Sequence, residues 1–213
     1  MILTDSSSAR IQSSVVTSIV SISPTFLQFM QYAALTVSSA ISGTIGLVKN
    51  GTAQLTLSGT CTYTGATQIN AGTLAITSAS TLNGVISGAG SLTKTGTAIL
   101  TIGGNNTYSG GTSFVASGIA NYILYSSSNA FGSGLFTLTG GSGRIDTSAI
   151  VTLPNDFLIS GTSLQYRTLV ATSTITITGN IAGTGNISKT GNGVLDLQGT
   201  LTYTGSTTIT AGT

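Results

Sequence analysis

The chain has 213 residues, but only 5% of them are charged, and histidine and tryptophan are absent. Six basic and four acidic residues give a formal net charge of +2, and they are too few and too scattered to form the basic surface of a nucleic-acid-binding protein. A hydrophobic content of 40% argues against a disordered chain, so we expect a folded protein whose surface consists largely of Ser and Thr hydroxyls.

Residues 1–40 predict a separate N-terminal segment that caps the rest of the chain or docks onto it. Within it, SSVVTSIVSI (13–22) is rich in Val and Ile, which is typical of a strand. The next stretch, SPTFLQFMQYAAL (23–35), places Pro24 at a first helical position and apolar residues at helical spacing, so it predicts a short helix. Serines interrupt the uncharged run too often for a membrane span, and a basic start typical of a secretory signal is not seen.

Residues 41–213 contain an internal repeat, whose copies begin at Ile41, Ile86 and Ile181 and align without a gap. Each copy has a lysine, a glycine two residues later, a tyrosine and a second glycine. These signature residues are Lys49, Gly51, Tyr63 and Gly65, then Lys94, Gly96, Tyr108 and Gly110, then Lys189, Gly191, Tyr203 and Gly205. Self-similarity at a fixed period indicates a solenoid.

Short runs such as QLTLSG (54–59) and VLDLQG (194–199) alternate apolar and polar residues, which predicts strands with one buried face. We therefore predict an all-β fold, a parallel β-solenoid with about two coils per repeat. A β-sandwich or a propeller explains the repeat less well. The expected units are 41–85, 86–130, a degenerate copy at 131–180, and 181–213.

The stretch from Gly51 to Leu74, GTAQLTLSGTCTYTGATQINAGTL, closely resembles the autotransporter-associated β-strand repeat, also called the passenger-associated transport repeat. The third copy matches it as well. The second departs at VASG (115–118), and Cys61 stands where the family often has Asn, as Asn106 does in the second copy. The resemblance implies a right-handed parallel β-helix in a secreted or surface-displayed bacterial protein, where such repeats form a stalk and accompany export.

The residues offer little for catalysis, because general acid–base chemistry needs His or acids with tuned pKa values. The one close pair of opposite charges is Arg144 with Asp146. A lyase-like site with Asp156 as helper is the functional interpretation, and a surface ion pair is the structural one. We predict no catalytic residue, no metal site and no cofactor.

The repeated residues also have two interpretations each. The lysines either form a basic stripe or are solvated charges that discourage aggregation of strand edges. The tyrosines either stack on sugars or serve packing at a coil corner. Cys61, the single cysteine, is either a small apolar filler or an intermolecular crosslink.

The expected function is that of a non-enzymatic extracellular structural protein: a β-helical rod segment displayed on a bacterial surface, or a subunit of a fibre. Because the sequence stops directly after TAGT (210–213), we expect head-to-tail self-association or continuation in a longer chain. An adhesin-type module that presents loops 120–166 to a glycan or a host protein is the alternative, and a polysaccharide lyase or hydrolase ranks third. A possible assembly segment comprises Val15, Val16, Ile19, Val20 and Ile22.

Overall fold

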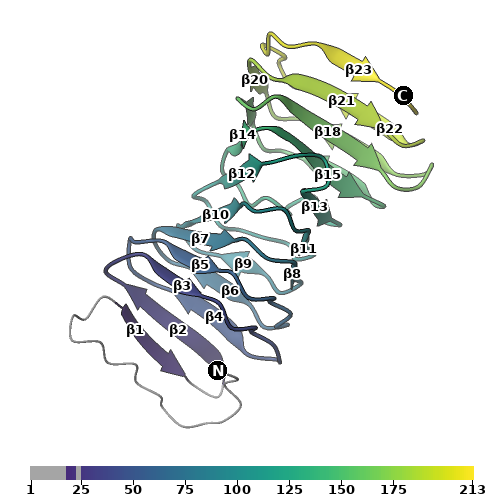
Figure 1. Cartoon of the computed structure of the whole chain (residues 1–213). Helices are drawn as coiled ribbons and strands as arrows, with labels where there is room; N and C mark the ends of the chain where they lie inside the picture. Colours follow the sequence, from purple (N-terminus) through teal and green to yellow (C-terminus); the bar gives the residue numbers. More distant parts are fainter. Residues whose placement is uncertain (1–17, 23–24) are drawn as a thin grey trace.

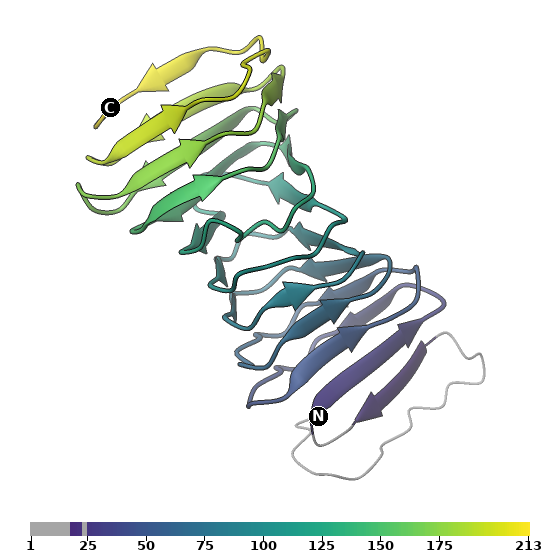
Figure 2. The same ribbon diagram turned by 180° about the vertical axis from the view of Figure 1, so that it is seen from behind.

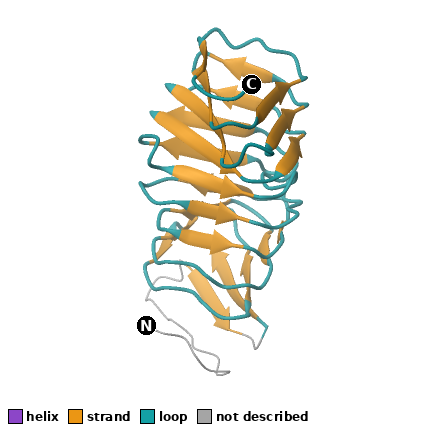
Figure 3. Cartoon of the chain, turned by 90° about the vertical axis from the view of Figure 1, so that its right-hand side faces the viewer, coloured by secondary structure: helices purple, strands orange, loops and turns teal. Residues whose placement is uncertain are grey.

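The computed structural model describes residues 18–22 and 25–213, which form a stack of coils with about nine turns (Figure 1). Strands cover the sides of the stack and loops its corners, as the view from its side shows (Figure 3). The described residues contain 23 strands and no helix. Except where the first two strands pair, neighbouring strands are parallel. The predicted parallel β-solenoid is confirmed.

Four sheets run along the stack. The first contains β1 (Ser18–Ile22), β2 (Phe26–Gln31), β4 (Gly46–Lys49), β6 (Thr67–Ile69) and β9 (Ile86–Ser87). The second contains β3 (Leu35–Val37), β5 (Leu55–Leu57), β7 (Thr73–Ile76), β10 (Ser91–Lys94), β12 (Thr112–Ala116), β14 (Phe136–Gly140), β17 (Phe157–Ile159) and β20 (Ile181–Gly183). The third contains β8 (Ser80–Leu82), β11 (Leu100–Ile102), β13 (Tyr122–Tyr125), β15 (Ser142–Thr147), β18 (Ser163–Thr168), β21 (Asn186–Thr190) and β23 (Thr207–Ile209). The fourth contains β16 (Ile150–Leu153), β19 (Thr174–Ile177) and β22 (Val194–Leu197).

The N-terminal segment contains a strand where a helix was predicted. The short helix expected within residues 23–35 is wrong, because Phe26–Gln31 forms β2. Alternate side chains of β2 point inward, and its parallel neighbour β4 supplies matching positions, with Leu27 opposite Leu47. The apolar spacing of this stretch is compatible with a helix and with a strand, and pairing with the next coil decides for the strand.

The proposed assembly segment is partly visible. Val15 and Val16 lie outside the described residues. Ile19, Val20 and Ile22 lie in β1, which pairs antiparallel with β2 of the same chain. Docking of this segment on a neighbouring molecule therefore stays a prediction.

One repeat covers two and one-third coils, not the two coils expected. Lys49 on β4 pairs with Ile69 one coil later, and β6 pairs in turn with β9. Lys94 lies beyond β9 on the following strand, β10 of the second sheet. Lys189 lies on β21 of the third sheet. Successive copies of the signature therefore fall on successive sides of the solenoid. Figures 1 and 2 show the ribbon of the solenoid from opposite directions.

The stretch between the second and third copies contains longer coils. The register runs from Lys94 through Phe114, Leu138 and Ile159 to Gly183, which is four coils, and Lys189 follows on the next side. The interval from Lys94 to Lys189 is thus four and one-third coils, whereas two repeats of two and one-third coils each would need four and two-thirds.

Aromatic rings fill the interior of these longer coils. A continuous row contains Tyr125, Phe131, Phe136, Phe157 and Tyr166, with centroid distances of 5.1, 4.8, 4.9 and 6.0 Å between neighbours. Edge and tilted contacts of this kind add stabilisation beyond burial of area.

Glycines allow coils to approach each other closely at the corners. A Cβ atom on Gly65 would lie 2.3 Å from the carbonyl oxygen of Ile45, and one on Gly205 would lie 2.2 Å from that of Gly185. Gly110 meets the backbone of Gly90 in the same way, at 2.5 Å. At these positions, space rather than backbone dihedral angle requires glycine.

We expect Gly65→Ala to lower the free energy of unfolding by about 2 kcal/mol or more, because the new methyl group forces two coils apart. Chemical denaturation measures the change. Gly141→Ala is the matched control, since a Cβ there meets only ordinary contacts, the nearest at 3.5 Å. The control should leave stability unchanged or raise it by about 0.5 kcal/mol. Equal effects of the two substitutions would contradict the close-approach explanation.

Candidate functional site

The signature lysines lie inside the solenoid. Lys49, Lys94 and Lys189 are each no more than 1% exposed. Their strand neighbours on the two adjacent coils are apolar or aromatic: Phe29 and Ile69, Ile76 and Phe114, and Tyr166 and Ile209, respectively. Both sequence interpretations, a basic stripe and solvated surface charges, are therefore wrong.

Backbone carbonyl groups hold the lysine ammonium in the first repeat. Lys49 Nζ donates to the carbonyl oxygens of Asn50 at 3.3 Å, Gly51 at 2.9 Å and Ala71 at 3.0 Å. The first two acceptors belong to the turn after β4, and the third belongs to the next coil. The ammonium therefore joins two coils by charge-assisted hydrogen bonds.

The third repeat reproduces this arrangement. Lys189 Nζ donates to the carbonyl oxygens of Thr190 at 2.9 Å, Gly191 at 2.7 Å and Ala211 at 3.2 Å. The hydroxyl of Thr168, on the preceding coil, is a further acceptor at 3.3 Å. We call this unit the lysine turn: the lysine, the two residues after it, and the alanine 22 residues further along the chain.

The second repeat has a weaker lysine turn. Lys94 Nζ donates to the carbonyl oxygen of Thr95 at 2.6 Å and to that of Gly96 at 3.5 Å. The equivalent alanine is Ala116, whose carbonyl oxygen accepts the backbone N–H of Gly141 at 2.8 Å. Both acceptors of Lys94 belong to its own turn, so among the described residues its ammonium makes no hydrogen bond to the next coil.

Burial lowers the pKa of all three lysines, since the interior disfavours the charged form. For Lys94 the pKa falls to about 8. This residue is also the one whose ammonium has the fewest carbonyl acceptors.

The glycine of each lysine turn has a left-handed backbone. The φ angles are +62° at Gly51, +75° at Gly96 and +77° at Gly191, a region that favours glycine. A Cβ on Gly51 would also lie 2.1 Å from the carbonyl oxygen of Gln31 on the previous coil. Glycine is thus required here both for its conformation and for space.

Each signature tyrosine bridges a corner of the solenoid through a hydrogen bond to a threonine, and we call this pair the tyrosine–threonine clamp. Tyr63 and Thr67 share a hydroxyl–hydroxyl hydrogen bond of 2.7 Å, and Tyr108 and Thr112 share one of 2.5 Å. In the third repeat, Tyr203 bonds Thr207 in the same way. Each threonine begins the strand after the corner, so the pair fixes the path of the chain between two sides.

The sugar-stacking interpretation fails for the first two tyrosines. Tyr63 is 2% exposed and Tyr108 is fully buried, so neither ring is available to a ligand. Tyr203 is partly buried and packs against the core. The threonine partners were not predicted, although each copy places a threonine four residues after the tyrosine.

Cys61 fits the filler interpretation rather than the crosslink. It is buried and unpaired, and its thiol donates to the carbonyl oxygen of Gly59 at 3.5 Å. Burial raises the pKa of this thiol. Asn106, at the equivalent position, instead bridges coils: its side chain accepts the N–H of Ile86 and donates to the carbonyl of Ala130.

The one acidic side chain buried among the described residues is Asp146. Arg144 Nε lies 2.8 Å from one of its carboxylate oxygens, and Arg167 Nη1 lies 3.7 Å from the other. The Arg144 guanidinium also covers the ring of Tyr122 at 4.2 Å. Burial raises the pKa of Asp146, although both arginines act in the opposite direction.

The lyase-like grouping of Arg144, Asp146 and Asp156 is not assembled. Asp146 lies on β15, whereas Asp156 lies between β16 and β17 on another side of the solenoid. The Asp156 carboxylate accepts the backbone N–H of Asn180 at 2.7 Å. The two carboxylates therefore lie on different sides of the solenoid.

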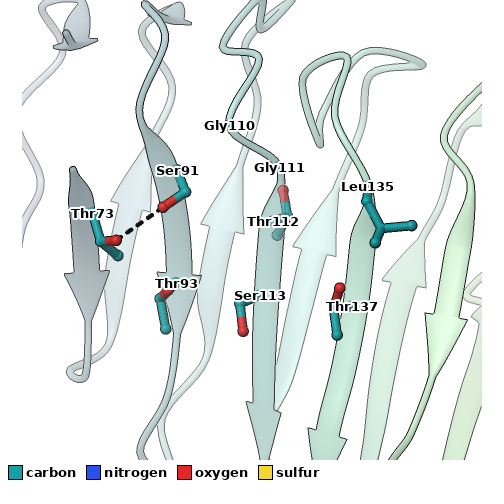
Figure 4. A pocket seen from close by; sticks show the side chains of 9 residues that line it. All are labelled: Thr73, Ser91, Thr93, Gly110, Gly111, Thr112, Ser113, Leu135 and Thr137. Carbon is teal, nitrogen blue, oxygen red and sulfur yellow. Dashed lines mark hydrogen bonds between the residues drawn. The ribbon is translucent and has the colours of Figure 1, made fainter. Parts of the chain in front are cut away.

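A shallow open hollow of about 360 Å³ lies over β7, β10, β12 and β14 (Figure 4). Glycines, hydroxyl side chains and one leucine line it: Thr73, Ser91, Thr93, Gly110, Gly111, Thr112, Ser113, Leu135 and Thr137. The hydroxyls of Thr73 and Ser91 bond each other at 3.0 Å. Since none of these residues is ionisable, the hollow has no group suited to acid–base chemistry.

The described part of the chain lacks two further features. It holds no group of three or more His, Cys, Asp or Glu residues placed to bind a metal ion. Over the same residues, we find no helix with the length and apolar character needed to cross a membrane.

Comparison with known families finds one match. The sequence model described as Passenger-associated-transport-repeat matches residues 47–76, 92–119 and 187–213. Each matched segment contains one signature lysine and one tyrosine–threonine clamp. No curated protein and no solved structure matches the chain.

We expect Tyr63→Phe to lower the free energy of unfolding by about 1–2 kcal/mol, because Thr67 loses its buried partner. Urea unfolding measures the loss, and adding Thr67→Val should restore part of it. Tyr125→Phe is the control, since its buried hydroxyl has no hydrogen-bond partner among the described residues. That variant should be as stable as the wild type or more stable, and a loss equal to that of Tyr63→Phe would refute the clamp.

Burial raises the pKa of Tyr63, Tyr108, Tyr125 and Tyr166 above the value of about 10 expected in the unfolded chain. The unfolded chain therefore releases protons first, and stability that is complete below pH ~10 is lost as the pH rises further. We expect phenolate absorbance of these rings to appear together with loss of the circular dichroism of the fold. Ionisation of all four rings with the fold intact would contradict their burial.

Proposed function

Because the chain carries three repeats of the passenger-associated-transport-repeat family on one parallel β-solenoid, we propose that it is a non-catalytic rod segment of a secreted or surface-displayed bacterial passenger. The single observation that supports this role best is how the repeated side chains are used. The lysines hold turns, the tyrosines hold corners, and the glycines let coils approach. The signature residues therefore stabilise the stack of coils.

The ionisable side chains support a structural role as well. The lysines are buried against carbonyl groups, and Asp146 is held between two arginines. Asp156 and Asp196 accept hydrogen bonds from Asn180 and Gln198. A lyase or hydrolase needs acids that converge on one substrate, whereas Asp146 and Asp156 lie on different sides of the solenoid and Asp196 lies on a later coil.

An adhesin-type role is the second candidate. The longer coils between residues 120 and 166 expose large apolar side chains, with Leu135 at 45% and Ile150 at 77%. Exposed apolar residues on a polar surface suit contact with a glycan or a host protein. Head-to-tail assembly into a fibre is a further form of the structural role, in which parallel coils of two molecules would pair as coils pair within one.

Surface proteolysis of the encoding bacterium tests the proposal. We expect intact cells to present the protein to added protease, and the purified protein to appear as short rods or filaments by negative-stain electron microscopy. A cytosolic marker that stays protected in the same cells is the control. Protection of the protein inside unbroken cells would refute surface display.

The rival functions have separate readouts. Binding on a glycan array that disappears in an Ile150→Ser variant would favour the adhesin. Turnover of an acidic polysaccharide that disappears in Asp146→Ala, with the fold retained, would replace the structural role by an enzymatic one.

A further inference from the structure

The second lysine turn differs from the other two in its contact with the next coil. In the first and third repeats, the lysine bonds the carbonyl group of an alanine one coil further on, Ala71 or Ala211. Lys94 bonds only Thr95 and Gly96, and the second of these bonds is long, at 3.5 Å. The Lys94 residue is as fully buried as Lys49.

A local change of sequence explains the missing bond. In the first repeat, β6 ends at Ile69, and Gly72, with φ of +66°, turns the chain so that the Ala71 carbonyl meets the lysine. In the second repeat, serine replaces this glycine at position 117, and β12 stays extended to Ala116. The Ala116 carbonyl then bonds Gly141 instead.

No opposite charge replaces the lost acceptor. The strands paired with β10 are β7 and β12, and neither carries a titratable side chain. Ile76 and Phe114 flank Lys94 on these strands. Burial is accordingly the one cause of its lowered pKa. A charged group buried with incomplete hydrogen bonding lowers the stability of the coil that contains it.

We propose that the Lys94 turn is a built-in opening point of the solenoid, at which the coil of β10 separates from the coil of β12 before the lysine turns on either side open. Opening exposes the ammonium to water, and closing buries it against two carbonyl groups. This inference does not depend on the function proposed above.

Protonation sets the direction of the effect. The pKa of Lys94 lies at about 8 in the folded chain, below the value of 10.5 for a free side chain. The open state therefore binds the proton more tightly, so that neutral pH favours opening. As the pH rises from 8 towards 10.5, the closed state gains stability.

Hydrogen exchange of the full chain, followed by mass spectrometry, tests the proposal. At pH 7, after correction for intrinsic rates, residues 92–97 should exchange about tenfold faster than the equivalent residues 47–52, the effect of one charge-assisted hydrogen bond. Fraying from the N-terminal end would give the opposite order, because 47–52 lies nearer that end. Equal protection, or faster exchange of 47–52, would overturn the proposal.

Two matched variants separate the weak turn from the strong one. Lys49→Met should reduce the protection of residues 47–52 about tenfold or more, whereas Lys94→Met should leave the protection of 92–97 unchanged or increase it. A larger loss for Lys94→Met would overturn the proposal. Should Lys49→Met fail to fold, a pH series decides: the ratio of the two wild-type exchange rates should fall between pH 7 and 9, and this fall should be lost in Lys94→Met. An equal fall in that variant would overturn the proposal.

Discussion

Parallel backbone hydrogen bonds between successive coils place each residue beside a counterpart 18 to 24 positions away along the chain. This pairing constrains every inward position, because its side chain must pack against the residues one coil before and one coil after it. Apolar side chains meet the requirement along most of the interior. The lysine turns meet it differently, with an apolar stem in the core and an ammonium that satisfies carbonyl groups at the corner.

The spacing of the copies, counted in coils, explains the arrangement of the signature. The second lysine lies two and one-third coils after the first, and the third lies four and one-third coils after the second, so the three lysines lie on different sides and never stack on one another. Like charges are thereby kept apart inside a low-dielectric core. The clamps follow the same rotation, so that each of the three corner types receives one tyrosine–threonine pair.

The strand at Phe26–Gln31 and the buried lysines both differ from their predictions for one reason: contacts with a neighbouring coil decide them. Phe26–Gln31 has apolar residues that suit a helix or a strand, and the choice depends on β4, which lies twenty residues away in sequence. Lysine is ordinarily exposed, so both interpretations of the repeated lysines, a basic stripe and solvated charges, place them on the surface. Burial became favourable only because the turn and the next coil direct their carbonyl groups at one point.

The sequence by itself determined the all-β class, the parallel coils, and a repeat that resembles a known family. Periodicity and self-similarity are local properties that can be read without knowing which coil lies beside which. Only the tertiary structure decided where the lysine ammonium groups lie, which threonine each tyrosine bonds, and why Lys94 has fewer acceptors than Lys49. These outcomes depend on hydrogen bonds between coils, and a change at position 117 acts on Lys94 through space rather than along the chain.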